Sequence, residues 1–76
     1  MERQSFFDRM NRTKKRVLDA IGGPDVRAAI RQQDAYLVYI GLCHEAQIAI
    51  DTNELDEEIL KQLDEYAEKV ISLAKK

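Results

Sequence analysis

Nine consecutive residues, from Ala35 to Cys43, carry neither a charge nor an amide in their side chains, in a chain of only 76 residues. A chain of this length forms one domain and buries only about 60–65% of its unfolded surface, so such a run strongly constrains the fold. The run is too short to cross a bilayer, which takes about 20 apolar residues. Its tyrosine and β-branched side chains permit a strand, but both flanks have helical patterns and would leave that strand's backbone unpaired. We therefore expect the run to be helical.

Two sets of turn-forming residues divide the chain into three predicted helices. The Gly-Gly-Pro sequence at residues 22–24 combines a helix-ending glycine with a proline suited to a first helical turn. The Asp-Thr-Asn sequence at residues 51–53 has the chemistry of a turn. Ser5 is the expected N-cap of the first helix and Asp56 that of the last. The expected helices cover residues 5–21, 24–50 and 56–75. The sequence thus predicts an all-α fold, a three-helix bundle or helical hairpin, in a single helical domain over residues 1–76.

The predicted central helix, residues 24–50, is apolar around more than half of its circumference. An ordinary surface helix has an apolar stripe a little over 100° wide, so this helix needs neighbours on more than one side. The first helix, with about 16 residues against about 27, is too short to cover it. Because each exposed large apolar side chain forgoes roughly 1.5–3 kcal/mol of burial, we expect a homodimer or a larger assembly. The residues expected at this self-association interface are Tyr36, Tyr39, Ile40 and Cys43.

Charge is unevenly distributed along the chain. Residues 1–31 contain eight basic and four acidic residues, a net charge of +4, whereas residues 32–76 contain four basic and ten acidic residues, a net charge of −6. The first predicted helix carries a basic face made of Arg9, Arg12, Lys15 and Arg16. This face can pair with the acids of the last helix, with an acidic protein partner, or with the phosphates of a nucleic acid. The overall net charge of −2 favours the first two, because nucleic-acid-binding domains are typically basic.

Cys43, His44 and Glu45 form the one cluster of chemically reactive side chains. Consecutive helical residues point about 100° apart, so these three cannot converge on one metal ion or substrate. We expect Cys43 to be a small buried apolar side chain and His44 to lie at a helix edge or interface. No catalytic residue, metal site or cofactor is expected. A single cysteine cannot form an internal disulfide, which fits a reducing, cytoplasmic location, and no membrane association is expected.

These patterns favour a small non-enzymatic helical protein that binds proteins, as adaptors, inhibitors and chaperones do. We expect it to self-associate through its central helix and also to bind another protein. The alternative is a regulator that binds nucleic acid through the basic face of the first helix.

Overall fold

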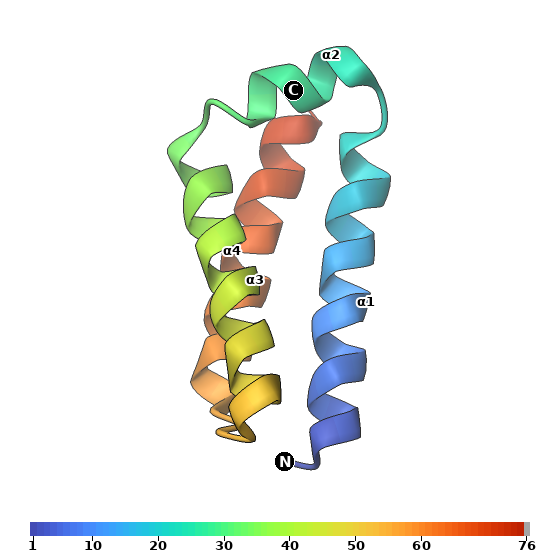
Figure 1. Cartoon of the computed structure of the whole chain (residues 1–76). Helices are drawn as coiled ribbons and strands as arrows, with labels where there is room; N and C mark the ends of the chain where they lie inside the picture. The colour runs from blue at the N-terminus through green and yellow to red at the C-terminus, as the bar shows by residue number, and fades with distance from the viewer. Residues whose placement is uncertain (76) are drawn as a thin grey trace.

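The computed structural model describes residues 1–75, which contain four α-helices. The helices are α1 (Arg3–Ile21), α2 (Pro24–Ile30), α3 (Asp34–Thr52) and α4 (Glu57–Ala74). The three long helices lie side by side along the 36 Å axis of the molecule, and the short α2 crosses one end (Figure 1). The prediction of an all-α fold is confirmed. Residue 76, the last of the predicted domain, lies outside the described residues. No helix within residues 1–75 combines the length and the apolar character needed to cross a membrane.

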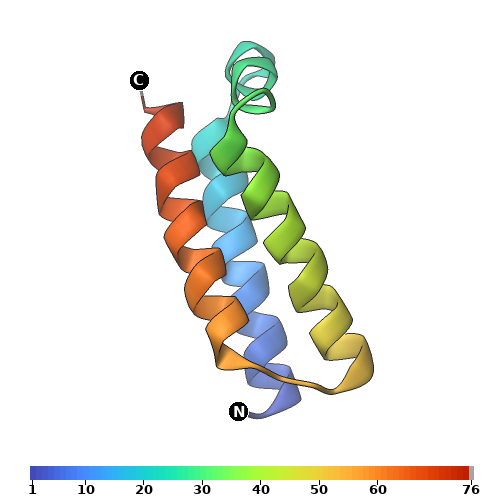
Figure 2. The same ribbon diagram turned by 90° about the vertical axis from the view of Figure 1, so that its left-hand side faces the viewer.

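α4 holds the bundle together. It packs along both α1 and α3, whereas α1 and α3 touch each other much less. The chain runs up α1, down α3 and up α4, so α1 and α3 are antiparallel (Figures 1 and 2). The largest fully buried side chains are Phe6, Met10, Val17, Leu60, Leu63 and Val70. All six belong to α1 or α4, so the most tightly enclosed part of the core lies between these two helices.

α1 begins earlier than the sequence predicts. Its first residue is Arg3, and Glu2 occupies the N-cap position without a side-chain hydrogen bond. The amide of Phe6 donates to the Glu2 carbonyl at 3.0 Å, which closes a helical turn ahead of the predicted start. Ser5 therefore lies inside the first turn, and the prediction that it caps the helix is wrong.

The Gly-Gly-Pro sequence at residues 22–24 forms the predicted turn between α1 and α2. Gly22 has a φ of 59°, a conformation that is strained for residues with a Cβ atom. Its amide donates the last helical hydrogen bond of α1, to the Leu18 carbonyl at 3.3 Å, and its positive φ then ends α1 after Ile21, as predicted. Pro24 is the first residue of α2. An amide at this position has no partner within the helix, so the missing N–H of proline costs no hydrogen bond.

The prediction of one helix over residues 24–50 is wrong, because residues 31–33 separate α2 from α3. Gln33 has an extended backbone at the N-cap of α3. A continuous helix of this length would be about 40 Å long, and its first turns would project past the bundle. The break instead lets α2 cross the ends of α1 and α4, and Ile30 becomes 3% exposed. α1 and α3 then have 19 residues each, so the predicted mismatch in length is also wrong.

The turn before α4 follows the predicted capping chemistry. Asn53 ends α3 in the left-handed conformation, with a φ of 59°. A carboxylate oxygen of Asp56 accepts a hydrogen bond from the Glu58 amide at 2.9 Å, so Asp56 is the N-cap. The helix itself covers Glu57–Ala74, within one residue of each predicted end.

Candidate functional site

A hollow of about 240 Å³ lies between α1 and α3, towards the end that α2 crosses. We name it the interhelical groove. The residues that line it are Lys14, Val17, Leu18 and Ile21 of α1, and Tyr36, Tyr39, Ile40 and Cys43 of α3. This set includes all four residues that the sequence predicts for self-association. The structure therefore brings them together at one surface.

The groove exposes apolar surface on both of its sides. Leu18 is 61% exposed and Ile40 is 44% exposed, while Tyr36 and Cys43 are half-buried. Tyr39 is only 4% exposed, and the centroid of its ring lies 6.1 Å from that of Tyr36. Tyr39 is thus part of the core that supports the groove wall. The surface open to contact consists mainly of Leu18, Tyr36, Ile40 and Cys43.

Burial favours the neutral forms of Cys43 and Tyr39 in the groove wall. Burial raises the pKa of the Cys43 thiol, although the hydrogen bond with Tyr39 and the charge of Lys14 act in the opposite direction. Burial, followed by the hydrogen bond with Cys43, raises the pKa of Tyr39. The thiol is therefore protonated near neutral pH, whereas a reactive cysteine needs a lowered pKa.

Cys43, His44 and Glu45 do not form a site together. Cys43 faces the groove, whereas His44 and Glu45 are exposed and do not line it. Within residues 1–75, no group of three His, Cys, Asp or Glu residues is placed to hold a metal ion. The groove thus offers apolar contact and one nearby positive charge, that of Lys14.

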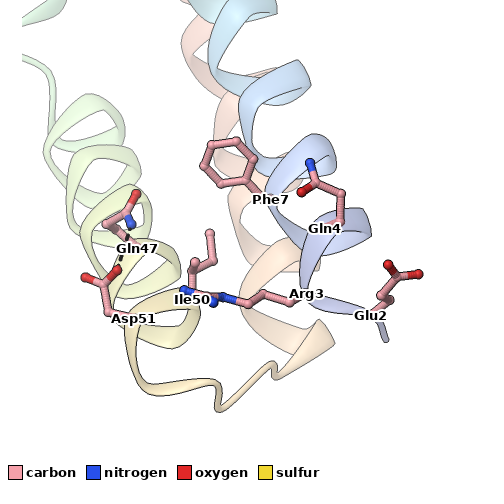
Figure 3. Close-up of a pocket in the computed structure, with 7 residues that line it drawn as sticks. All are labelled: Glu2, Arg3, Gln4, Phe7, Gln47, Ile50 and Asp51. Carbon is pink, nitrogen blue, oxygen red and sulfur yellow. Dashed lines mark hydrogen bonds between the residues drawn. The ribbon is translucent and has the colours of Figure 1, made fainter.

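A second hollow lies between the same two helices at the opposite end of the bundle (Figure 3). Phe7, which is 38% exposed, and Ile50 contribute apolar surface to it. Its other lining residues are polar, and Gln47 donates to a carboxylate oxygen of Asp51 at 3.1 Å. Arg3 extends from the start of α1 towards the α3 side of this hollow (Figure 3). The face between α1 and α3 is therefore hollowed at both ends, and its more apolar end is the interhelical groove.

The basic face of α1 is divided between internal pairing and exposure. Arg9 donates to a carboxylate oxygen of Asp64 at 2.8 Å, and Arg16 pairs with Glu68. Of the three alternatives for this face, these two arginines thus pair with acids of the last helix. Arg12 and Lys15, the other two predicted residues, are exposed and form no ion pair within residues 1–75.

Sequence reasoning missed the contribution of α1 to the groove. Leu18 and Lys14 fall on the apolar side of α1, but their position in the sequence does not show which helix lies beside them. The sequence does contain one signal for this surface. At helical spacing, Phe7 and Leu18 lie with Lys14 on one edge of α1, beside the buried stripe, and thus indicate a second row of apolar side chains. α3 has further exposed apolar residues outside the groove lining, namely Leu37, Val38 and Ile48, and Ile48 lines a separate hollow between α3 and α4.

Comparisons of the chain with protein-family models, with curated proteins and with solved structures found no match.

Proposed function

We propose that this chain is a non-enzymatic helical interaction protein that self-associates through the interhelical groove. The observation that carries the proposal is the apolar surface that Leu18 and Ile40 expose on the two sides of one hollow. Burying a large apolar side chain is worth roughly 1.5–3 kcal/mol, which is a sizeable share of the stability of a small domain. An interface that covers the groove would recover this free energy. The chain has a single cysteine, which cannot form an internal disulfide, and on this basis we propose a reducing, cytoplasmic location.

The test is the mass of the chain in dilute solution, measured by analytical ultracentrifugation over a range of concentrations. We expect the wild-type chain to be at least a dimer at micromolar concentration. Leu18→Lys and Ile40→Lys, which each place a charge in the groove, should produce monomers. The matched control is Val38→Lys, because Val38 is also exposed on α3 (42%) but does not line the groove. A wild-type chain that is monomeric at these concentrations contradicts the proposal.

Nucleic-acid binding through α1 is the second candidate, and it rests on Arg12 and Lys15, which no carboxylate of residues 1–75 neutralises. It ranks lower because Arg9 and Arg16 already pair with carboxylates of α4. Retention of DNA and RNA at low and high salt separates the two candidates. A nucleic-acid binder binds at low salt and loses affinity steeply as salt rises.

A further inference from the structure

Each face of the bundle between two long helices has its own chemistry. The ion pairs of Arg9 and Arg16 lie across the face between α1 and α4, and the interhelical groove lies between α1 and α3. The hollow between α3 and α4, of about 530 Å³, lies at the end of the bundle away from α2, beside the turn that joins these two helices (Figure 1). We name it the acidic groove. Its α3 side is formed by Glu45, Ile48 and Thr52, and its other side by Leu55 and Ile59.

The acidic groove combines exposed apolar surface with negative charge. Ile48 is 47% exposed, and Leu55 and Ile59 are half-buried. The charged side chains that line the groove are all acidic, namely Glu45, Glu54 and Asp56. None of these three carboxylates forms an ion pair within residues 1–75, although Asp56 caps α4.

The basic residues of the two helices beside the acidic groove do not offset this charge. α3 contains three acidic residues and no lysine or arginine. On α4, Lys61 points about 160° away from Ile59 around the helix. Lys69 packs over the Tyr66 ring and lies about 15 Å from Ile59 along the helix axis. The groove is therefore an apolar surface of negative charge.

Exposed apolar surface continues from the acidic groove along one edge of α3. Residues three or four positions apart share an edge of a helix. The residues of this edge are Val38, Gly41, Glu45, Ile48 and Thr52, of which the last three line the groove. Val38 is 42% exposed. The edge is about 21 Å long, which is the length of about four helical turns.

Gly41 lies within this edge, at a position where the folded chain does not require glycine. Its backbone is helical, and a Cβ atom added there meets nothing within 4 Å. Glycine inside a helix is destabilising relative to alanine. The missing side chain leaves room for another backbone to approach α3 closely.

We propose that the acidic groove and this edge of α3 bind a basic amphipathic helix of another protein. Apolar side chains of the partner, three or four residues apart, lie on Val38 and Ile48, as in other helix-in-groove complexes. The partner's backbone passes close to Gly41, and its lysine or arginine side chains pair with Glu45 and Glu54. This site lies on a different face from the interhelical groove and does not depend on self-association.

The experiment measures binding of a synthetic peptide to the full chain by fluorescence anisotropy. The probe is a labelled peptide of about 18 leucine and lysine residues, with leucines spaced three and four apart so that they share one face of a helix. The matched probe has glutamate in place of every lysine. We expect the leucine–lysine peptide to bind with an affinity that falls as salt rises, and the leucine–glutamate peptide not to bind.

Three variants of the chain locate the peptide. Ile48→Lys should weaken binding about tenfold or more, because it places a like charge on the apolar contact. Glu45→Lys should weaken it about fivefold. Gly41→Leu should weaken it about tenfold by blocking the close approach, without lowering the free energy of unfolding, because the new side chain meets nothing in the folded chain.

Two matched controls change other faces and should bind the peptide as the wild type does. Leu18→Lys alters the interhelical groove, and Asp19→Lys reverses an exposed charge on α1. Absence of binding, equal binding of the two peptides, or binding that Ile48→Lys and Gly41→Leu leave unchanged overturns the proposal. So does an equal loss with Leu18→Lys, which would place the peptide in the interhelical groove.

Solution mass separates this proposal from the proposed function. If Ile48→Lys rather than Leu18→Lys converts a dimeric chain to a monomer, a second copy occupies the acidic groove and the proposed partner is wrong. A wild-type chain that is monomeric and binds the leucine–lysine peptide with the expected variant effects supports this inference and contradicts self-association.

Discussion

Thr13 is a buried polar residue, 5% exposed, in the contact between α1 and α4. Its hydroxyl lies 2.6 Å from a carboxylate oxygen of Asp64, the same carboxylate that pairs with Arg9. Thr13→Val keeps the shape of the side chain but leaves that carboxylate without one donor. We expect it to lower the free energy of unfolding by about 1–2 kcal/mol, measured by urea denaturation.

The matched control is Thr52→Val at the exposed end of α3, where the hydroxyl bonds only to the Ile48 carbonyl at 2.9 Å. Surface substitutions of this kind usually change stability by less than about 0.5 kcal/mol. Equal effects at Thr13 and Thr52 would show that the buried bond to Asp64 adds nothing.

Gly41 and Gly22 should respond in opposite ways to alanine. Gly41 lies within α3, and a Cβ atom added there meets nothing within 4 Å. Gly41→Ala should therefore stabilise the fold by about 0.5–1 kcal/mol. Gly22 has the positive φ of a helix end, so Gly22→Ala should destabilise it by about 1 kcal/mol or more. Both changes are measured by thermal unfolding in the Leu18→Lys background, in which we expect no self-association, and a gain at Gly22 would contradict this reasoning.

Tyr39 and Cys43 should make the fold sensitive to alkali, because burial raises the pKa of both groups. In the unfolded chain a thiol ionises near pH 8.5 and a phenol near pH 10. Above these values the unfolded state releases protons that the folded state retains, so ionisation favours unfolding. Stability is therefore fully present below about pH 8 and falls as the pH rises towards about 11. Urea denaturation across this range tests the expectation, and Cys43→Ala with Tyr39→Phe should flatten the decline. A wild-type chain whose stability is constant over this range would refute it.

At the scale of the elements, the local chemistry of the side chains predicts where helices end better than it predicts where a helix is interrupted. The Gly-Gly-Pro turn and the Asp56 cap are visible in the sequence because their own side chains and backbone preferences produce them. The break at residues 31–33 is not visible, because Arg31, Gln32 and Gln33 are all tolerated inside helices. We attribute the break to tertiary packing, because with α2 across the end of the bundle Ile30 is buried in the core. Similarly, a helical wheel places Tyr36 and Ile40 on the apolar arc of their helix, but it cannot show that α1 forms the other side of the interhelical groove.

The break between α2 and α3 can be strengthened, because Gln33 holds the N-cap position of α3 without a side-chain hydrogen bond. Serine is a strongly preferred N-cap, since its hydroxyl accepts from the free amides of the first turn. Gln33→Ser should therefore raise the free energy of unfolding by about 0.5–1 kcal/mol, measured by urea denaturation. Gln32→Ser, one residue outside the cap, is the matched control and should give no gain. If Gln33→Ser instead destabilised the chain, residues 31–33 would be helical.

At the scale of the whole molecule, three long helices of nearly equal length leave one face open. α4 fills the space on one side of α1 and α3, while the opposite side is hollow at both ends. α3 supplies five buried hydrophobic residues to the core, as α4 does, but it also carries more large exposed hydrophobic residues than the other helices. Four of the seven large exposed hydrophobic residues, Leu37, Val38, Ile40 and Ile48, belong to it. Of these four, Ile40 lines the interhelical groove, whereas Ile48 lines a hollow between α3 and α4, so the apolar surface of α3 is divided between two faces of the bundle.

If two copies fold and associate together, thermal stability must depend on protein concentration. Binding that occurs only in the folded state stabilises that state by mass action. For a chain of this size each tenfold rise in concentration above the dissociation constant should raise the unfolding midpoint by about 3–5 °C. Scanning calorimetry over a hundredfold range measures this shift directly. Leu18→Lys should unfold at one temperature at every concentration, and Val38→Lys should keep the concentration dependence of the wild type. A wild-type midpoint that does not move would mean that the groove between α1 and α3 is left open in the folded state.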